Sequence, residues 1–323
     1  MTAKTYTGEE MFPSLIGQDR VKKQLAFFYK GYMANGRMPH FMFTAPRGCG
    51  KTMMASALAD SLKARTPEKK KIVFNCSQLR NLRQFWNEII IPHINDKDCT
   101  VLFDEASEMP KDVMMALLTV LNPNPEGRTQ FSYEEYTVDF DFSRQTFMFA
   151  TTEGQTIFHA LMDRMERIDL QEYSTDELAK ICHIGLEDYD VDEAALKEVA
   201  TVLRGNPRAA AKMKDKIKAY LDGNHQKKFL IKDWNNLRHE LDILPLGLLN
   251  KEFELLQILR RKKETRLTEL AAITCLSKGA IQRDYEMFLM KQGLMEIAAG
   301  GRALTTKGHK YLRDIEEKKK KAK

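Results

Sequence analysis

The chain has 323 residues and a net charge of +6, a length that allows two or three domains, each with its own core. It has no apolar run of 18 residues and no apolar segment near its start, so we expect neither a membrane span nor a signal peptide, and a cytoplasmic location. Five scattered cysteines without a CxxC pair predict small buried side chains, not disulfides or zinc ligands.

The positive charge is unevenly distributed along the chain. Residues 244–323 contain 18 Lys and Arg against 10 Asp and Glu, whereas residues 1–243 contain 33 against 35. The basic excess therefore lies in the C-terminal quarter, as expected of a module that faces nucleic acid, although a solvated basic surface has the same composition. The closing run of lysines predicts a disordered tail.

The N-terminal part predicts disorder over residues 1–11, then an amphipathic helix that carries Leu25, Phe28 and Tyr32 on one face. A short apolar run at residues 41–43 follows and predicts a buried strand.

That strand runs into the sequence APRGCGKT at residues 45–52 and then into an Ala-rich helix. Gly48 and Gly50 let backbone N–H groups surround phosphate oxygens, Lys51 reaches the β- and γ-phosphates, and the start of the helix adds positive potential. Ala45 replaces the first glycine of the GxxxxGK[ST] pattern, which is compatible with the loop if its φ stays negative. The alternative is a chance glycine-rich turn. The residues expected to bind ATP are Pro46, Gly48, Cys49, Gly50, Lys51 and Thr52, with Thr52 also a ligand of Mg²⁺.

A second strand is predicted at residues 72–74, followed by a helix that ends near Pro92. Residues 100–105, TVLFDE, then predict an apolar strand that finishes in two carboxylates. Asp104 can hold Mg²⁺ or its water, and Glu105 can orient and polarise the water that attacks the γ-phosphate. This pattern favours ATP hydrolysis over ATP binding alone, whereas an exposed acidic turn would have no such role.

Residues 127–142 alternate in character and predict a β-hairpin, either a plain surface feature or a site for a partner. Residues 147–150 predict another buried strand, which ends in Thr151 and Thr152, placed to hydrogen-bond the attacking water or the γ-phosphate. Strands that alternate with helices predict an α/β fold with a parallel sheet covered on both faces.

From Thr175 the pattern is helical, and Pro207 opens a helix with Arg208 at its start, where an arginine could reach back to a nucleotide. After a break at residues 245–247, three short helices and a Gly-Gly hairpin predict a winged helix-turn-helix, which binds DNA or docks on protein. The expected domains are a nucleotide-binding domain at 1–170, a helical lid domain at 171–243, a winged helix at 244–315 and a Lys-rich tail at 316–323.

Together these motifs resemble the RuvB family, the AAA+ motors of Holliday-junction branch migration, from about residue 12 to residue 312. The matching stretches are IGQ at 16–18, the loop at 45–52, DE at 104–105, ATT at 150–152, LMDR at 161–164, EYSTDELA at 172–179, GNPR at 205–208, QGL at 292–294 and GR at 301–302. The resemblance implies an ATPase that translocates double-stranded or branched DNA.

The resemblance also implies roles for particular residues. Arg164 takes the place of the arginine finger, which completes the site of a neighbouring subunit and so implies a homo-oligomeric ring, expected to be a hexamer. The hairpin at 127–142 corresponds to the one by which the family docks on RuvA, which implies a RuvA-type partner. The other implied roles are second sensor for Arg208, adenine pocket for Ile16 with Tyr173, cofactor binding for Gly17 beside Ile16, and DNA contact for Arg302.

The chain departs from the family pattern at three places. Ala106 and Ser107 follow Asp104-Glu105 where the family has Ile-His, the wing has Ala298 and Ala299 where basic residues are expected, and the tip of the hairpin differs. These departures indicate a divergent member, and a phage-borne relative is one origin that fits them.

Two other classes of protein share the ATPase core. A clamp-loader subunit usually has Ser-Arg-Cys at the finger and ends in a helical collar, not a winged helix. A replication-initiator-like protein combines an ATPase with a winged helix but acts as an ATP-switched DNA-binding scaffold. A motor hydrolyses ATP continuously with DNA, while a scaffold hydrolyses slowly and stays in place, so ATP turnover separates them.

Overall fold

The computed structural model describes residues 7–122, 128–133, 136–142, 144–157 and 159–321. Contacts within the chain divide it into two compact units, one that ends at Trp234 and one that begins at Asn235. The division falls inside α10 (Ile231–Glu240). Among the described residues, none of the helices is both long enough and apolar enough to cross a membrane.

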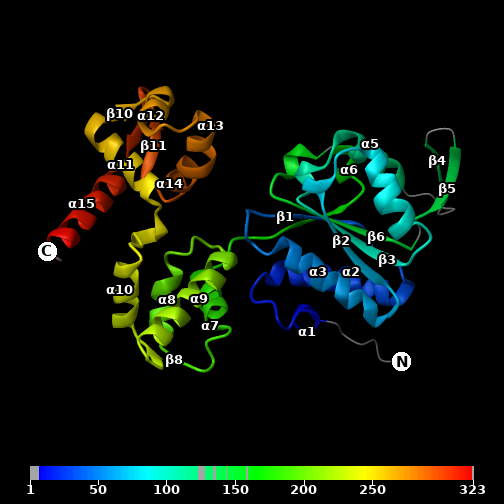
Figure 1. Cartoon of the computed structure of the whole chain (residues 1–323), viewed down its shortest axis with the longest axis horizontal. Helices are drawn as coiled ribbons and strands as arrows, with labels where there is room; N and C mark the ends of the chain where they lie inside the picture. Colours follow the sequence, from blue (N-terminus) through cyan, green and yellow to red (C-terminus); the bar gives the residue numbers. More distant parts are fainter. Residues whose placement is uncertain (1–6, 123–127, 134–135, 143, 158, 322–323) are drawn as a thin grey trace. The chain divides into compact units, whose positions relative to one another are not determined.

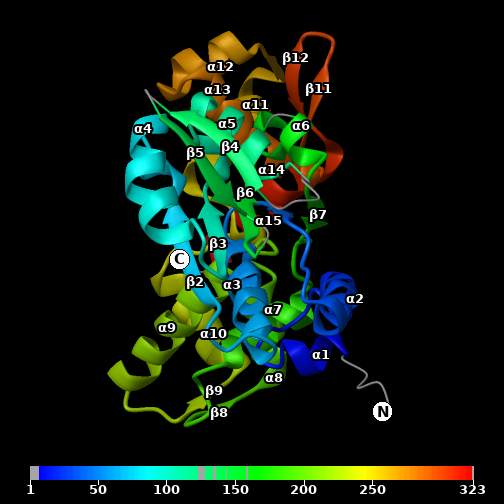
Figure 2. The same ribbon diagram turned by 90° about the vertical axis from the view of Figure 1, so that its right-hand side faces the viewer.

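The first unit is built on a parallel sheet of five strands (Figure 1, Figure 2). The strand order is β2-β3-β6-β1-β7, so β6 lies between the strand that leads into the phosphate loop and the strand that ends in two carboxylates. The predicted α/β fold with a parallel sheet is confirmed. The strands are β1 (Phe41–Thr44), β2 (Lys70–Asn75), β3 (Cys99–Asp104), β6 (Thr146–Thr151) and β7 (Glu166–Asp169).

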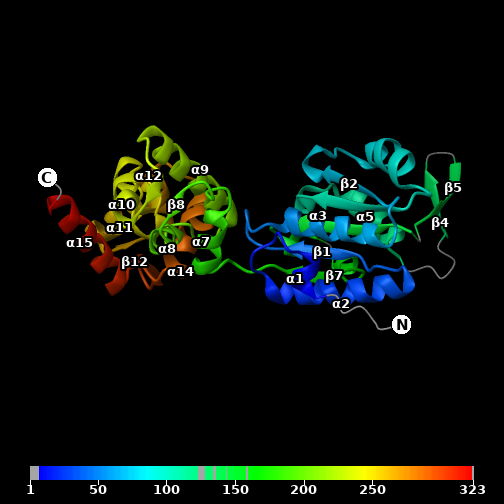
Figure 3. The ribbon, with the colours of Figure 1, turned by 90° about the horizontal axis from the view of Figure 1, so that it is seen from below.

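Helices cover both faces of this sheet, and successive strand residues point to opposite faces. In β3, Leu102 belongs to one apolar core, whereas Val101 and Phe103 belong to the other. The first core is covered by α1, α2 and α3, and the second by η3 and α5 (Figure 1, Figure 3). The helices of the sheet domain are α1 (Gly8–Met11), α2 (Asp19–Asn35), α3 (Lys51–Ser61), α4 (Leu82–Gln84), the π-helix η3 (Phe85–Ile94), α5 (Lys111–Val120) and α6 (His159–Met162).

Short 3-10 turns connect several of these elements: η1 (Leu62–Ala64), η2 (Cys76–Gln78), η4 (Ala106–Glu108) and η5 (Gly154–Thr156). The predicted hairpin is present as β4 (Arg128–Tyr133) and β5 (Tyr136–Asp141), which pair antiparallel (Figure 1). Residues 127, 134 and 135 of the predicted hairpin lie outside the described residues.

The prediction of disorder over residues 1–11 is wrong for residues 7–11, while residues 1–6 lie outside the described part. Thr7 and Glu10 form a capping box at the start of α1, which satisfies backbone N–H groups that a short helix would otherwise leave exposed. Gly8 is buried against Lys22 of α2, where an added Cβ would lie 2.7 Å from the Lys22 Cβ. α1 and α2 therefore lie side by side (Figure 3).

The helix predicted to end near Pro92 instead continues to Ile94 as the π-helix η3, with Pro92 inside it. In a π-helix each backbone N–H donates to the carbonyl oxygen five residues earlier, in place of four. Pro92 has no backbone N–H, and it therefore lies within this wider hydrogen-bond pattern and not within a regular α-helix. Strand β7 was not predicted, because only Ile168 of its four residues is buried.

The helical part of the first unit contains α7 (Thr175–His183), α8 (Glu193–Ala200) and α9 (Pro207–Gly223). α7 begins with a capping box between Ser174 and Glu177, and α9 begins with Asn206 as its N-cap. The prediction of a wholly helical segment missed a two-residue parallel pair of strands, β8 (Asp190–Val191) and β9 (Lys228–Phe229).

The second unit is a winged helix, as predicted. Its apolar core draws on every helix of the unit from α11 onward except α13, and its sheet has the order β10-β12-β11. The predicted disordered tail is wrong up to Lys321, because α15 continues through the lysines after anchoring Leu312 and Ile315 in the core. The elements are η6 (Pro245–Gly247), α11 (Asn250–Lys262), β10 (Glu264–Thr265), α12 (Leu267–Thr274), α13 (Lys278–Ala280), the π-helix η7 (Ile281–Glu286), α14 (Met287–Lys291), β11 (Met295–Ala298), β12 (Gly301–Leu304) and α15 (Thr306–Lys321).

Candidate active site

The loop between β1 and α3 has the backbone of a phosphate-binding loop. Gly48 and Gly50 both have φ of +86°, a left-handed conformation that glycine adopts without strain. Gly50 is the N-cap of α3 and provides no side-chain cap, so the first-turn N–H groups of α3 are left for another acceptor. Ala45 is not among the residues with positive φ, which is the condition under which alanine can replace the first glycine. The uncapped helix start is therefore suited to an anion such as a phosphate.

Lys51 lies at the start of α3, with its ammonium turned back onto the loop. Its Nζ donates to the carbonyl oxygens of Ala45, at 2.9 Å, and Pro46, at 3.2 Å. Burial lowers the pKa of Lys51, and the negative charge of Asp104 acts in the opposite direction. A buried ammonium that donates to two backbone carbonyl oxygens can exchange them for phosphate oxygens.

Thr52 and Asp104 meet although they are 52 residues apart in the sequence. The Thr52 Oγ1 donates to both carboxylate oxygens of Asp104, at 3.1 and 3.0 Å. Asp104 is placed by the sheet, because it ends β3 in register with Asn75 of β2 and Ala150 of β6. A hydroxyl and a carboxylate are the hard oxygen ligands that Mg²⁺ takes beside phosphates, so this pair fits that ion.

Glu105 follows Asp104 but has a different environment. Its φ of +53° is left-handed, and its backbone N–H donates to the Asp104 Oδ1 at 3.0 Å. Glu105 is exposed and lines a cavity of about 350 Å³ beside the phosphate loop. Both carboxylates thus line the cavity, and Asp104 is the one that accepts the hydroxyl of Thr52.

This cavity brings together most of the predicted catalytic and phosphate-binding residues. It is lined from the sheet by Thr151 and Thr152 at the end of β6, and from the helical part by Arg208 of α9. Thr151 is buried, and its Oγ1 accepts from the backbone N–H of Glu153 at 3.0 Å, whereas Thr152 is exposed. The full lining is Arg47, Gly48, Lys51, Thr52, Ser77, Asp104, Glu105, Ser107, Glu108, Ala150, Thr151, Thr152 and Arg208.

The predicted adenine-pocket residues do not line this cavity, and of the three Tyr173 is the one that approaches the loop. Tyr173 is buried, and its hydroxyl would be 3.6 Å from a Cβ added to Gly50. Ile16 and Gly17 are half-buried and lead into Gln18, whose side chain donates to the Gln171 carbonyl at 2.7 Å and accepts from the Gln171 N–H at 3.1 Å. The two segments are therefore joined, two residues before Tyr173.

Arg164 lies apart from the cavity of its own chain. It follows α6, and its Nη1 donates to the carbonyl oxygen of Ala160. Its Nε is buried and has no hydrogen-bond partner among the described residues. The structure thus does not bring Arg164 to the site that its own phosphate loop forms.

Arg302, the predicted DNA contact, is engaged within the winged helix. Its Nε donates to the Glu286 Oε1 at 2.7 Å and its Nη2 to the Glu286 Oε2 at 3.1 Å. The two side chains are only 13% and 3% exposed, so this is a buried bidentate pair that ties β12 to η7. The contact with DNA stays a prediction for this residue.

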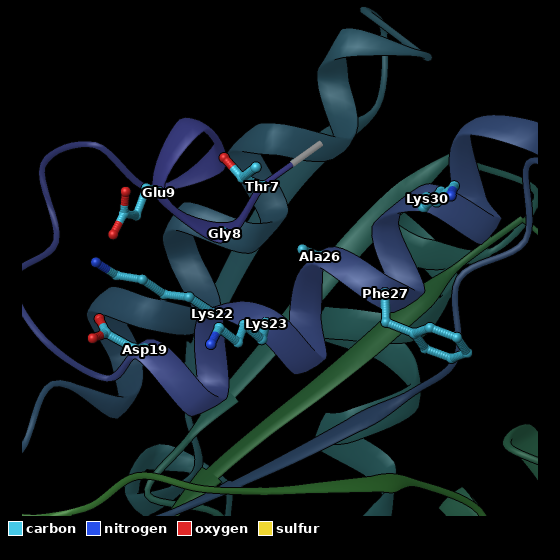
Figure 4. A pocket seen from close by; sticks show the side chains of 9 residues that line it. All are labelled: Thr7, Gly8, Glu9, Asp19, Lys22, Lys23, Ala26, Phe27 and Lys30. Atoms are coloured by element: carbon cyan, nitrogen blue, oxygen red, sulfur yellow. The ribbon is translucent and has the colours of Figure 1, made fainter. Parts of the chain in front are cut away.

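A second cavity, of about 420 Å³, lies along α1 and α2 (Figure 4). It is lined by residues such as Gly8, Lys22 and Phe27, and Phe27 is 73% exposed. The Lys22 ammonium donates to the carbonyl oxygen of Leu15. None of the predicted site residues lines this cavity, so it is separate from the phosphate loop.

Two residues of the site were not predicted. Gln18 joins the segment before α2 to the segment before Tyr173, and Asn206 joins the start of α9 to the phosphate loop. For each residue the sequence contains a local signal but no sign of the distant partner. Asn before Pro207 marks a helix N-cap, and Gln18 stands in the IGQ stretch, but neither pattern indicates the distant partner.

The fold and this site define an AAA+ ATPase with a C-terminal winged helix. Residues 41–173 match the model of the ATPase family associated with various cellular activities (AAA), and residues 245–313 match the model of the RuvB C-terminal winged helix domain. The chain is a RuvB-like AAA+ ATPase.

Similar proteins match along nearly the full length. The Holliday junction branch migration complex subunit RuvB of Nitratiruptor sp. is 25% identical over 315 residues, which cover 92% of this chain and 89% of that protein. The RuvB subunit of Campylobacter curvus is 26% identical over 313 residues, covering 92% and 87%. The structure of the Thermotoga maritima RuvB Holliday junction branch migration motor has the same fold, with a TM-score of 0.75, 22% identity, and coverage of 92% of this chain and 95% of that one.

Proposed function

We propose that this protein is an ATP-driven ring motor that translocates double-stranded DNA and drives branch migration of Holliday junctions. The observation that carries the proposal is the single cavity where the phosphate loop, the Thr52–Asp104 pair, Glu105 and Arg208 meet. The matched winged helix supplies a module of a kind that binds DNA, and the relatives named above are branch-migration subunits.

Each side chain in the cavity has a distinct part in ATP hydrolysis. Lys51 and the uncapped start of α3 bind the phosphates, while Thr52 and Asp104 would hold Mg²⁺, which neutralises phosphate charge when bound. Glu105 accepts a hydrogen bond from the attacking water and orients it, and Thr151 and Thr152, which line the same cavity, would help to position that water. Arg208 adds positive charge from the helical part.

The proposal of a ring rests on the position of Arg164, which does not line the cavity of its own chain, unlike Arg47 and Arg208. A phosphoryl-transfer site gains a large rate factor from an arginine finger supplied by the same or another chain. Since Arg164 lies outside its own cavity, we propose that it completes the site of the adjacent subunit in a homo-oligomeric ring, a hexamer. Ile16, Gly17 and Tyr173 would hold the adenine next to the loop.

The partners follow from the same assignment. We propose duplex or branched DNA as substrate, contacted by the winged helix, and a RuvA-type junction-binding protein docked on the β4–β5 hairpin. A cytoplasmic location fits a protein that uses ATP and DNA.

The test is strand displacement from a four-way junction with ATP, run with and without a RuvA-type protein. We expect displacement by the full chain and none by Lys51→Ala, which serves as the control for the ATP site. ATP turnover that stays slow in the presence of DNA, together with stable DNA binding, would instead indicate an initiator-like scaffold. Displacement that does not change when RuvA is added would contradict the docking role of the hairpin.

A further inference from the structure

Asn206 makes three hydrogen bonds with one amide group. Its Oδ1 accepts from the backbone N–H groups of Arg208, at 2.9 Å, and Ala209, at 3.2 Å, which is the N-cap of α9. Its Nδ2 donates to the backbone carbonyl oxygen of Arg47 at 3.1 Å. Because two N–H donors face one end of the amide and a carbonyl faces the other, the orientation of the side chain is fixed by its partners.

The bond to Arg47 crosses from the helical part of the unit to the phosphate loop, over 159 residues of sequence. The approach is close at the next residue too. A Cβ added to Gly48 would lie 2.5 Å from the Asn206 Oδ1 and 2.7 Å from its Nδ2. A glycine at position 48 therefore serves two purposes, since it gives the loop its left-handed backbone and leaves room for the Asn206 amide.

Both ends of this contact belong to the ATP cavity. Arg47 and Gly48 line it from the loop, and Arg208, two residues after Asn206, lines it from α9. A second link holds the same segment, because the backbone N–H of Tyr173 donates to the carbonyl oxygen of Gly205 at 3.1 Å. The start of α9 is thus tied on one side to the loop and on the other to the segment that leads into α7.

We propose that Asn206 is a positioning residue that sets the place of Arg208 over the phosphates by tying the start of α9 to the Arg47 carbonyl. The role requires an uncharged amide of this length. Serine and aspartate can cap a helix as well as asparagine does, but serine is too short to reach Arg47 and aspartate places an anionic oxygen against the carbonyl. The inference rests on the proposed ATPase function, although its first test does not require turnover.

The first test is hydrogen exchange of the full-length protein without nucleotide, in the wild type and in Asn206→Ser. We expect the peptide that covers residues 45–52 to exchange faster in the variant, while the melting temperature changes by no more than about 2 °C because the cap is retained. Unchanged exchange in this peptide would overturn the proposal, whether or not the protein hydrolyses ATP.

The second test is steady-state ATP hydrolysis by Asn206→Ser and Asn206→Asp. A misplaced arginine stabilises the transition state less, while it affects the binding of ATP in the ground state to a smaller degree. We therefore expect kcat to fall about 10- to 100-fold with a smaller change in KM. Asn224, at the other end of α9, offers a matched control, because its Nδ2 donates within its own helix, to the carbonyl oxygen of Tyr220 at 2.8 Å. Asn224→Ser should keep the wild-type kcat.

A double-mutant cycle with Arg208→Ala separates positioning from capping. If Asn206 acts through Arg208, then Asn206→Ser should lower kcat no further in the Arg208→Ala background. Losses in kcat that add in full, or a wild-type kcat in Asn206→Ser, would show that Asn206 only caps α9. An inactive wild-type protein would contradict the ATPase function itself and leave the exchange experiment to decide the tether.

Discussion

Glu105 and Asp104 are adjacent carboxylates whose roles are separated by one backbone turn. Asp104 accepts the Thr52 hydroxyl and is anchored in the sheet, while Glu105 has left-handed φ and faces the cavity. The sequence alone could predict this pair, because an apolar strand that ends in two acids is a local pattern. It could not predict which neighbours each carboxylate would have.

Glu105→Gln keeps the size of the side chain but removes the basic oxygen that orients the water. We expect ATP turnover to fall about 10²- to 10⁴-fold, while the affinity for ATP stays near that of the wild type. Turnover is measured in steady state and affinity by calorimetry. Near-normal hydrolysis would remove Glu105 from the catalytic assignment.

Arg302 has a partner within the fold that changes the role expected of it. The resemblance to the RuvB family implies a DNA contact for Arg302, but the structure pairs its guanidinium with Glu286, 16 residues earlier. Breaking a buried ion pair by removing one partner leaves an uncompensated charge. Arg302 is therefore expected to matter for the stability of the winged helix whether or not it also touches DNA.

Arg302→Ala should lower the free energy of unfolding of the winged helix by about 3 kcal/mol, because Glu286 stays buried without its partner. Arg283, exposed on η7, gives a control in Arg283→Ala, which should change the stability by less than about 0.5 kcal/mol. Chemical denaturation of both variants provides the measurement. The double variant Arg302→Met with Glu286→Leu should regain most of the lost stability, because it leaves no unpaired polar group in the buried position.

That double variant also tests the DNA contact without the complication of unfolding. If Arg302 binds a phosphate, the dependence of log affinity on log salt should become shallower by about 0.9 for duplex DNA. An unchanged slope with restored stability would show that the arginine serves the fold only.

Helices and strands with a clear pattern of apolar residues could be predicted from the sequence. Elements and contacts that depend on distant parts of the chain could not. The strands around the phosphate loop were evident because they are apolar along their length. β7 was missed since it buries only Ile168, and α15 was missed since its lysines conceal an apolar stripe that includes Leu312 and Ile315. The tether of Asn206 has no local signal, because its partner lies 159 residues away.

His40, just before β1, makes the central sheet sensitive to acid. Its Nδ1 accepts from the backbone N–H of Phe147 at 3.1 Å, and burial lowers the pKa of His40 to about 4. The neutral ring is therefore stabilised in the folded state, so its contribution is present above pH 6.5, the pKa of a free histidine, and is lost as the pH falls toward 4.

We expect the free energy of unfolding to fall by up to about 2 kcal/mol between pH 7 and pH 5 through this residue. His40→Gln removes the titrating group, so the variant should show a flatter pH dependence over the same interval. Urea unfolding at several pH values measures both. A pH dependence equal to that of the wild type would mean that other groups control it.

Between subunits, Arg164 distinguishes a ring from a monomeric enzyme. An arginine that crosses to a neighbouring site should cost about 10³-fold or more in turnover when removed, without changing the ATP affinity of its own chain. Arg164→Ala and Lys51→Ala should each be inactive alone. Mixed together they should recover some ATP hydrolysis, since an intact loop on one chain meets an intact finger on another.

A purely structural role of Arg164 would give different results in the same experiments. If Arg164 only braces α6 through its bond to the Ala160 carbonyl, the Arg164→Ala protein should unfold at a lower temperature. Mixtures with Lys51→Ala would then stay inactive at every ratio of the two proteins.

The close approach of Asn206 to Gly48 also constrains how this sequence can evolve. A side chain at position 48 is blocked as long as Asn206 occupies the space above it, so changes at the two positions are expected to occur in a fixed order, with 206 first. Even then the φ of +86° limits position 48 to residues that tolerate a left-handed backbone, such as asparagine. Among descendants of this gene, a residue other than glycine at 48 should therefore appear only together with a shorter residue at 206.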